Sequence, residues 1–139
     1  MPARRVHIEV GGVAAVAELC EDLSPKMAEA FWATLPIETT LSHGKWSGSA
    51  CFFQPADGPM RAVTALEYPV CSIYPGVLVA RPSGSEVLIS YGPAEYRWAI
   101  GTDYTTPVAK IVENREALLK ALARMHDEGD KVIAIRRQG

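Results

Sequence analysis

The amino-acid sequence predicts a mainly β protein, in which an antiparallel sheet is closed or nearly closed into a barrel and plugged by two α-helices. Two stretches repeat apolar residues at helical spacing, whereas about eight short stretches have the pattern of strands. Turn residues join most of these strands to the next one, as in hairpins. The chain of 139 residues is as long as one domain, expected to span residues 1–139.

The first part of the chain predicts a hairpin followed by a helix. Val6 to Val10 alternates apolar and polar side chains, and Gly11-Gly12 suits a two-residue turn into a partner strand from Val13 to Leu19. Ser24-Pro25 is typical of a helix start, and Pro36 ends this helix. Its apolar stripe consists of Ala28, Phe31, Trp32 and Leu35.

The middle of the chain is rich in strand patterns. A loop is expected from Gln54 to Pro59, where proline, aspartate and glycine gather. Arg81 to Ser85 is expected to join two strands rich in β-branched residues. The predicted strands of this region are Glu38–Leu41, Ser49–Phe53, Val77–Ala80, Val87–Ser90 and Tyr96–Ile100.

The last third predicts a strand, a helix and a closing strand. Val108 to Val112 is the first of these, and Asn114 is expected to cap the helix that follows. Gly129 is placed to end the helix, and Val132 to Ile135 forms the last strand. The apolar stripe of this helix consists of Leu118, Ala121, Leu122 and Met125.

Composition and charge favour a globular cytoplasmic protein. The chain is 48% hydrophobic and 22% charged, with a formal net charge of -2. Its basic clusters are Arg4-Arg5 and Arg136-Arg137, at the two ends, so we expect no nucleic-acid partner. The three cysteines lack a C-x-x-C spacing, which favours a reducing compartment. We expect neither a signal peptide nor a membrane partner, because no apolar run is long enough.

The main candidate site is the polar stretch from Ser42 to Gly48. His43 is the best candidate for a catalytic residue, as a general base, although a turn histidine hydrogen-bonded to backbone is the commoner role for such a residue. Lys45 either binds a carboxylate or is solvated. Trp46 either stacks on a ligand or packs against the protein, and Ser47 completes the group.

A second candidate cluster lies at Glu95-Tyr96-Arg97-Trp98. Arg97 can clamp a carboxylate with two hydrogen bonds or pair with Glu95 or Glu86. Tyr104 is expected near the same barrel mouth. A shared site requires both clusters to meet across one pocket. The predicted ligand-binding residues are His43, Lys45, Trp46, Ser47, Arg97 and Tyr104.

The sequence predicts neither a cofactor nor a metal. It contains no glycine-rich G-x-G-x-x-G or phosphate-loop motif. His7, His43 and His126 fall on three separate elements without i, i+4 partners. Cys51 lies in an apolar strand, which favours an inert buried thiol over a nucleophile.

Motifs spread over nearly the whole chain carry a family resemblance. They are Phe31–Leu35 with Ile37–Thr40, Trp46, Cys51–Phe53, Tyr74–Gly76, Ala109–Glu113 and Gly129–Val132. With this order of elements the chain resembles the cyclophilin-like β-barrel, and more narrowly a family of small uncharacterised prokaryotic proteins with that fold. The resemblance implies a cyclophilin-like domain plugged by two helices.

The resemblance to the fold does not carry over the activity of cyclophilins. Cyclophilins are peptidyl-prolyl isomerases whose site has an arginine within a Phe-His-Arg run, whereas the matching residues here are His43-Gly44-Lys45-Trp46. Lys45 lacks the planar fork of a guanidinium, so we regard isomerase activity as unfavoured. Other relatives of the fold resemble subunits of enzymes that act on small amides and cyclic carboxylates, which implies a small polar ligand.

Three functions therefore follow from the sequence. The first is binding of a small polar ligand, a carboxylate or an amide, at a pocket on the side of the barrel, with catalysis left open. The second is a non-catalytic interaction module that forms a homo-oligomer. The third, peptidyl-prolyl isomerase activity, is disfavoured by the missing arginine.

Overall fold

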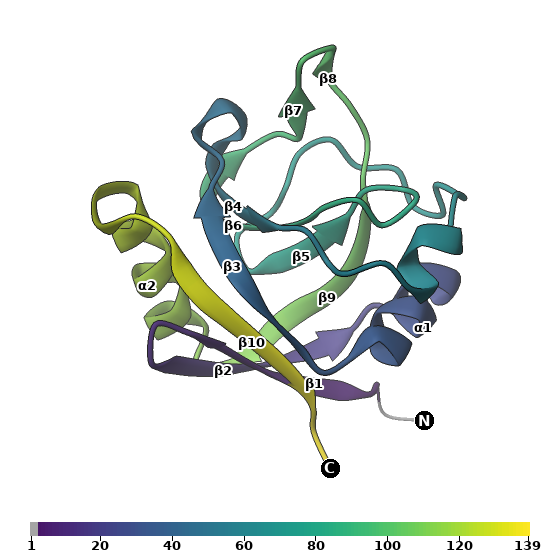
Figure 1. The fold of residues 1–139 in the computed structure, drawn as a ribbon, viewed down its shortest axis with the longest axis horizontal. Coiled ribbons are helices and arrows are strands. Elements are labelled where there is room, and N and C mark those ends of the chain that lie inside the picture. The colour runs from purple at the N-terminus through teal and green to yellow at the C-terminus, as the bar shows by residue number, and fades with distance from the viewer. Residues whose placement is uncertain (1–2) are drawn as a thin grey trace.

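The computed structural model describes residues 3–139, in which eight strands form a closed antiparallel barrel (Figure 1). Around the barrel the strands follow the order β1 (Arg5–Val10), β10 (Lys131–Arg137), β3 (Ile37–His43), β4 (Gly48–Phe53), β6 (Val87–Ala94), β5 (Val77–Ala80), β9 (Thr106–Glu113) and β2 (Val13–Leu19). Two α-helices, α1 (Pro25–Thr34) and α2 (Arg115–Glu128), complete the fold. The predicted mainly β fold, with a closed antiparallel barrel and two helices, is confirmed.

The first and last strands close the barrel. β1 pairs with β2 on one side and with β10 on the other, with Ile8 opposite Ala15 and Ile135. Every barrel strand therefore has two hydrogen-bonded neighbours, and the barrel has no free sheet edge.

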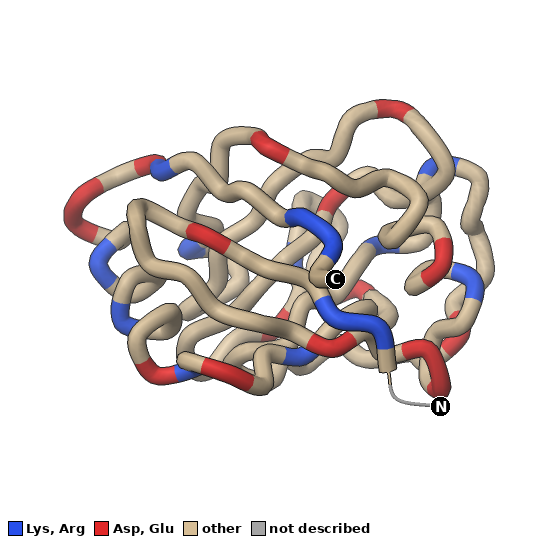
Figure 2. Tube along the Cα trace, turned by 90° about the horizontal axis from the view of Figure 1, so that it is seen from below, with Lys and Arg blue, Asp and Glu red and all other residues tan. Residues whose placement is uncertain are grey.

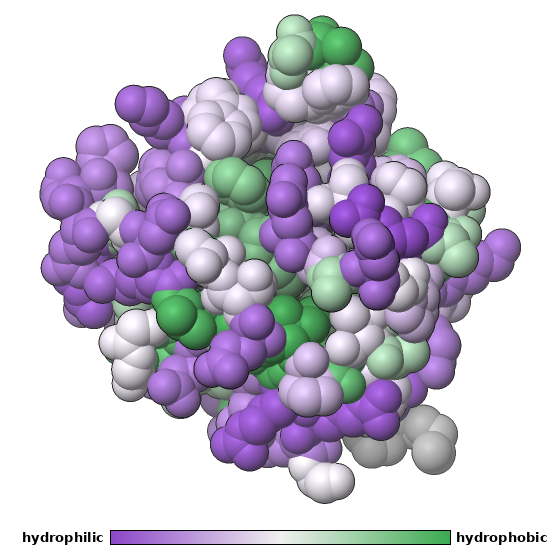
Figure 3. Space-filling model, in the orientation of Figure 1, coloured by the Kyte–Doolittle hydropathy of each residue, from purple (hydrophilic) through white to green (hydrophobic). Residues whose placement is uncertain are grey.

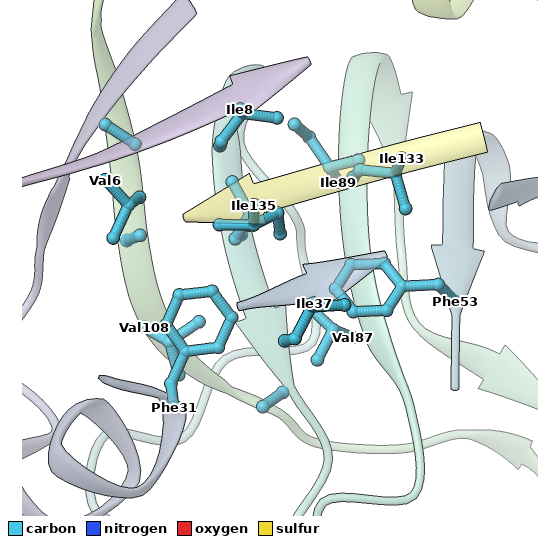
Figure 4. Packing of buried hydrophobic residues seen from close by; sticks show 14 of the residues in the cluster. Val6, Ile8, Phe31, Ile37, Phe53, Val87, Ile89, Val108, Ile133 and Ile135 are labelled. Atoms are coloured by element: carbon cyan, nitrogen blue, oxygen red, sulfur yellow. The ribbon is translucent and has the colours of Figure 1, made fainter. Parts of the chain in front are cut away.

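Alternate residues of the strands fill the barrel, and both helices contribute to the same core. Val6, Ile8 and Val10 are fully buried, as their period-two pattern predicts. Figure 4 shows Phe31 of α1 turned toward the interior that the strand side chains line. Leu122 of α2 belongs to the same cluster, so the two helices plug the barrel.

The stripe predicted for α1 faces the core, and Trp32 at its edge packs against the core only in part. Ala28, Phe31 and Leu35 are buried, whereas Trp32 is only half-buried. The guanidinium carbons of Arg4 and Arg137 lie 4.9 and 4.8 Å from its ring centre. Cation–π contacts with the two chain ends thus stabilise this indole at the surface.

The basic clusters of the two ends lie side by side (Figure 2), because β1 and β10 are neighbours. Arg4 forms ion pairs with Glu21 and Glu29. Arg5 forms ion pairs with Glu18 and Glu113, both at 3.0 Å. Carboxylates therefore offset much of the positive charge of this patch.

The predicted strand from Tyr96 to Ile100 is wrong. Only β7 (Arg97–Trp98) is extended, and the chain turns back at residues 99–100 into β8 (Gly101–Thr102), which forms a small separate sheet with β7. Gly101 has a φ of 104°, a conformation that favours glycine and permits this turn. The loop predicted up to Pro59 ends one residue earlier, at the 3₁₀-helix η2 (Pro59–Ala62).

Both expected helix caps differ from the prediction. Ser24 and Asn114 occupy the N-cap positions, but neither side chain accepts a hydrogen bond from its helix. Ser24 instead hydrogen-bonds Thr106, and Asn114 donates to the Ala14 carbonyl. The carboxylate of Glu67 caps α1, because it accepts hydrogen bonds from the backbone N–H groups of residues 26 and 27 at 3.0 and 2.9 Å.

Across residues 3–139, none of the helices combines the length and the apolar character that a membrane span needs.

The Glu67 cap makes the stability of α1 depend on a distant loop. Glu67→Ala leaves two backbone N–H groups unpaired and should lower the free energy of unfolding by about 1 kcal/mol. Urea denaturation measures this change. Glu67→Gln, which keeps one acceptor oxygen, should cost less, and equal stability of all three proteins would contradict the capping role.

Candidate functional site

The first polar cluster forms a rigid 3₁₀ turn between β3 and β4. This turn, η1 (Lys45–Ser47), is held by hydrogen bonds from the Gly44 N–H to the Ala50 carbonyl and from the Ser47 N–H to the Gly44 carbonyl. Gly48 closes it with a φ of 105°, and a Cβ there would lie 2.7 Å from the Pro93 carbonyl oxygen. Lys45 and Trp46 are consequently presented to solvent, with Trp46 54% exposed.

Ser47 connects the first polar cluster to the second. Its side chain is buried, and its Oγ accepts a hydrogen bond of 3.1 Å from the Arg97 N–H. Its carbonyl accepts another of 2.9 Å from the Glu95 N–H. Ser47 therefore holds β7 against η1, and Lys45, Trp46 and Arg97 lie beside one another as a result.

These residues line a two-part hollow, which we call the Trp46 cleft. Its polar part encloses about 340 Å³, and the side chains that line it include Lys45, Trp46, Ser47, Glu95 and Arg97. Its apolar part encloses about 560 Å³ and is lined by Trp46, Arg97, Trp98 and Glu86. Because Trp46 and Arg97 line both parts, one ligand can occupy the two together.

Both indole walls of the cleft are fixed by contacts outside it. The Trp46 ring packs on Phe52, with ring centres 5.4 Å apart. Trp98 donates from Nε1 to the Asp103 carboxylate at 2.8 Å, and the Arg81 guanidinium lies 4.5 Å from its ring centre. The Trp98 hydrogen bond lowers the pKa of Asp103, so that this acceptor stays charged.

The charges of the cleft are only partly compensated. Lys45 forms no ion pair with any residue between 3 and 139. Arg97 lies 3.8 Å from Glu95, and both side chains are about half exposed, so the predicted alternative of an ion pair is present but long. Burial raises the pKa of Glu86, and nearby Arg81 opposes that rise.

His43 lies apart from the cleft. It shares a hydrogen bond of 2.6 Å between Nε2 and the Tyr91 hydroxyl, and its ring centre is 5.3 Å from that of His126 on α2. Burial, followed by His126 and Lys45, lowers the pKa of His43, which keeps the imidazole neutral near pH 7. The residues that line the Trp46 cleft do not include His43.

The structure thus brings together four of the six predicted binding residues: Lys45, Trp46, Ser47 and Arg97. Tyr104 follows β8, and its side chain is 52% exposed. Neither Tyr104 nor His43 is among the residues that line the Trp46 cleft. The period-two pattern could have signalled the position of His43, since it shares a strand face with buried Ile37 and Leu41.

The sequence analysis did not place two of the residues that line the apolar part of the cleft. Trp98 and Glu86 line the apolar part of the cleft, although they come from different hairpins. Cys51 is a buried thiol, as its apolar strand predicts. Burial raises the pKa of this thiol to about 12, so that it stays protonated and unreactive near pH 7.

Within residues 3–139, no three His, Cys, Asp or Glu side chains gather closely enough to hold a metal ion.

The lowered pKa of His43 predicts a pH dependence of stability. The unfolded chain protonates this imidazole near its ordinary pKa of 6.5, whereas the folded protein resists protonation. Stability present above about pH 6.5 is therefore lost as the pH falls through the lower folded pKa. Urea unfolding between about pH 8 and pH 5 should show a smaller loss in His43→Gln. If the free energy of unfolding fell equally with pH in both proteins, His43 would contribute nothing to the pH dependence of stability.

Comparison with solved structures supports the barrel fold. McbB, solved in complex with tryptophan, aligns with a TM-score of 0.78 at 24% identity over 96% of this chain. The chain spans only 45% of the McbB chain. The hypothetical protein AF2241 from Archaeoglobus fulgidus, solved in solution, aligns with a TM-score of 0.66 at 16% identity, covering 98% of this chain and 95% of its own. At these identities the two structures show the fold alone.

Comparison with curated proteins produced no match. A family model described as a protein of unknown function, DUF3830, matches residues 6–136, which is almost the whole chain. The chain therefore belongs to the DUF3830 family.

Proposed function

We propose that the protein binds a small carboxylate in the Trp46 cleft. The observation that carries this proposal is the position of Lys45, an ammonium group without an ion-pair partner among residues 3–139, in the same hollow as Trp46 and Arg97. Glu95 offsets part of the charge of Arg97 in the same hollow, so the excess cation is Lys45, and a cation beside a preformed concave surface favours an anionic ligand. Of the polar groups that a small ligand can carry, a carboxylate fits this cation best, and an amide can accept the same hydrogen bonds.

The apolar part of the cleft favours a ligand that also carries a flat group. Trp46 and Trp98 offer two indole surfaces whose orientations are fixed by Phe52 and Asp103. Rigid aromatic walls lose little conformational entropy when a ring packs against them. Tryptophan, the ligand in the McbB structure, combines a carboxylate with a flat ring, which is consistent with this ligand class.

The cyclophilin-like assignment of the barrel is also part of this proposal. The observed order of two strands, a helix, a run of strands, a second helix and a last strand supports it. Lys45 stands on η1 where a cyclophilin-like isomerase would need an arginine, so we propose ligand binding rather than prolyl isomerisation.

A second candidate function is self-association through the β7–β8 hairpin. The hairpin projects from the barrel, and Figure 3 shows apolar residues at its tip. Ile100 at this tip is 68% exposed. An exposed aliphatic side chain on a projecting turn is suited to packing against a second copy.

The binding proposal is tested by titrating indole-3-acetate into the protein in a calorimeter. Lys45→Met and Arg97→Met should each weaken binding about tenfold, because each removes a cation that faces the carboxylate. Indole-3-acetamide distinguishes a requirement for charge from hydrogen bonding alone. Lys120→Met, which removes an exposed cation from α2, is the matched control and should leave the affinity unchanged. Absence of binding to the unaltered protein would refute the proposal.

Self-association is tested by light scattering at increasing protein concentration. The unaltered chain should show a mass above that of a monomer, and Ile100→Asp should restore the monomer because it places a charge in the apolar contact. A monomer at all concentrations would exclude this second function.

A further inference from the structure

A second hollow lies on the outer wall of the barrel, where β5 and β9 run side by side. Val77 and Val79 of β5 and Pro107 of β9 form its floor, and the segment 66–76 lies across it. It encloses about 230 Å³, and most of its lining is apolar. We call it the outer slot.

The segment that covers the outer slot is held at several points by the barrel. Val70 and Thr105 exchange two backbone hydrogen bonds, of 2.9 and 2.8 Å. Gly76 donates to the Ser90 carbonyl at 2.9 Å and accepts from Ile111 at the same distance. A slot with both walls fixed is preformed, so that a ligand need not order it.

Two tyrosines form the rim of the outer slot. Tyr74 is 71% exposed and Tyr68 is 47% exposed, although both side chains line the apolar hollow. Aromatic rings attract another ring at the edge or face, in addition to the gain from apolar burial. The rim therefore favours an aromatic ring over an aliphatic chain of equal volume.

One end of the outer slot carries the positive charge of Lys110, which lies opposite Glu18 in the β2–β9 register. Lys110 lines it and forms no ion pair with any residue in the part of the chain described, 3–139. The neighbouring Cys20 thiol is buried, and burial raises its pKa to about 11, so it supplies no negative charge at neutral pH. Three carboxylates line an adjoining hollow with Lys110: Glu18 and Glu21 are paired with Arg5 and Arg4, whereas Asp22 forms no ion pair among the described residues.

We propose that the outer slot binds a small aromatic acid with a single ring. The ring lies against Val77, Val79 and the two tyrosines, and its carboxylate faces the Lys110 ammonium. An apolar cavity of about 150 Å³ accommodates benzene, so the slot has room for one substituted ring. This site shares no residue with the Trp46 cleft and does not depend on the function proposed for it.

Benzoate is the probe, and its binding to the full chain is followed by chemical-shift changes in NMR spectra. Val77→Trp fills the slot and should weaken benzoate binding at least tenfold, whereas Val132→Trp, at an exposed valine of β10, should not. Lys110→Met should weaken benzoate binding severalfold but leave benzyl alcohol, which has the ring without the charge, unchanged. Lys120→Met is the control for loss of a lysine elsewhere.

Further variants identify the site that is occupied. Tyr74→Ala alters a largely exposed side chain, leaves the fold intact and should also weaken binding. Benzoate binding that is lost in Trp46→Ala but kept in Val77→Trp and Tyr74→Ala would place the acid in the Trp46 cleft and overturn the proposal. Equal affinity for benzoate and hexanoate, or no binding of benzoate, would overturn it as well.

Discussion

The pairing of β1 with β10 is the constraint on which the rest of the molecule depends. It joins the two ends of the chain, closes the barrel and leaves no strand with an unpaired edge. Closure also defines an interior that α1 and α2 plug and an exterior on which η1 and the segment 66–76 are fastened. Both hollows are thus built on the outside of a scaffold whose rigidity comes from its closed ladder of hydrogen bonds.

Most of the fold could be predicted because its signals are local. The period-two pattern of Val6 to Val10 and the helical spacing of Leu118, Leu122 and Met125 each depend on residues near in sequence, and the structure confirms them. The predictions fail where a residue far away in the sequence determines the local structure. Arginines from both chain ends lie against the half-buried ring of Trp32, and α1 is capped by a carboxylate 40 residues further along.

The candidate site was predictable in part for the same reason. Lys45 and Trp46 stand out by composition, and their meeting with Arg97 follows from the buried hydroxyl of Ser47, which was expected to contact ligand. No local pattern reveals that a serine holds two hairpins together. His43 was grouped with Lys45 by proximity in sequence, whereas its strand face directs it toward Tyr91 and α2. What these residues bind stays a prediction.

The segment 66–76 has two structural roles. Through Glu67 it completes the first turn of α1, and through Tyr68 and Tyr74 it walls the outer slot. The two are therefore thermodynamically linked: a molecule that lodges beside the tyrosines restrains the same stretch of backbone that holds the carboxylate on the helix. Amide protons in the opening turn of α1 would then exchange more slowly with solvent, reporting occupancy from a position that no ligand touches.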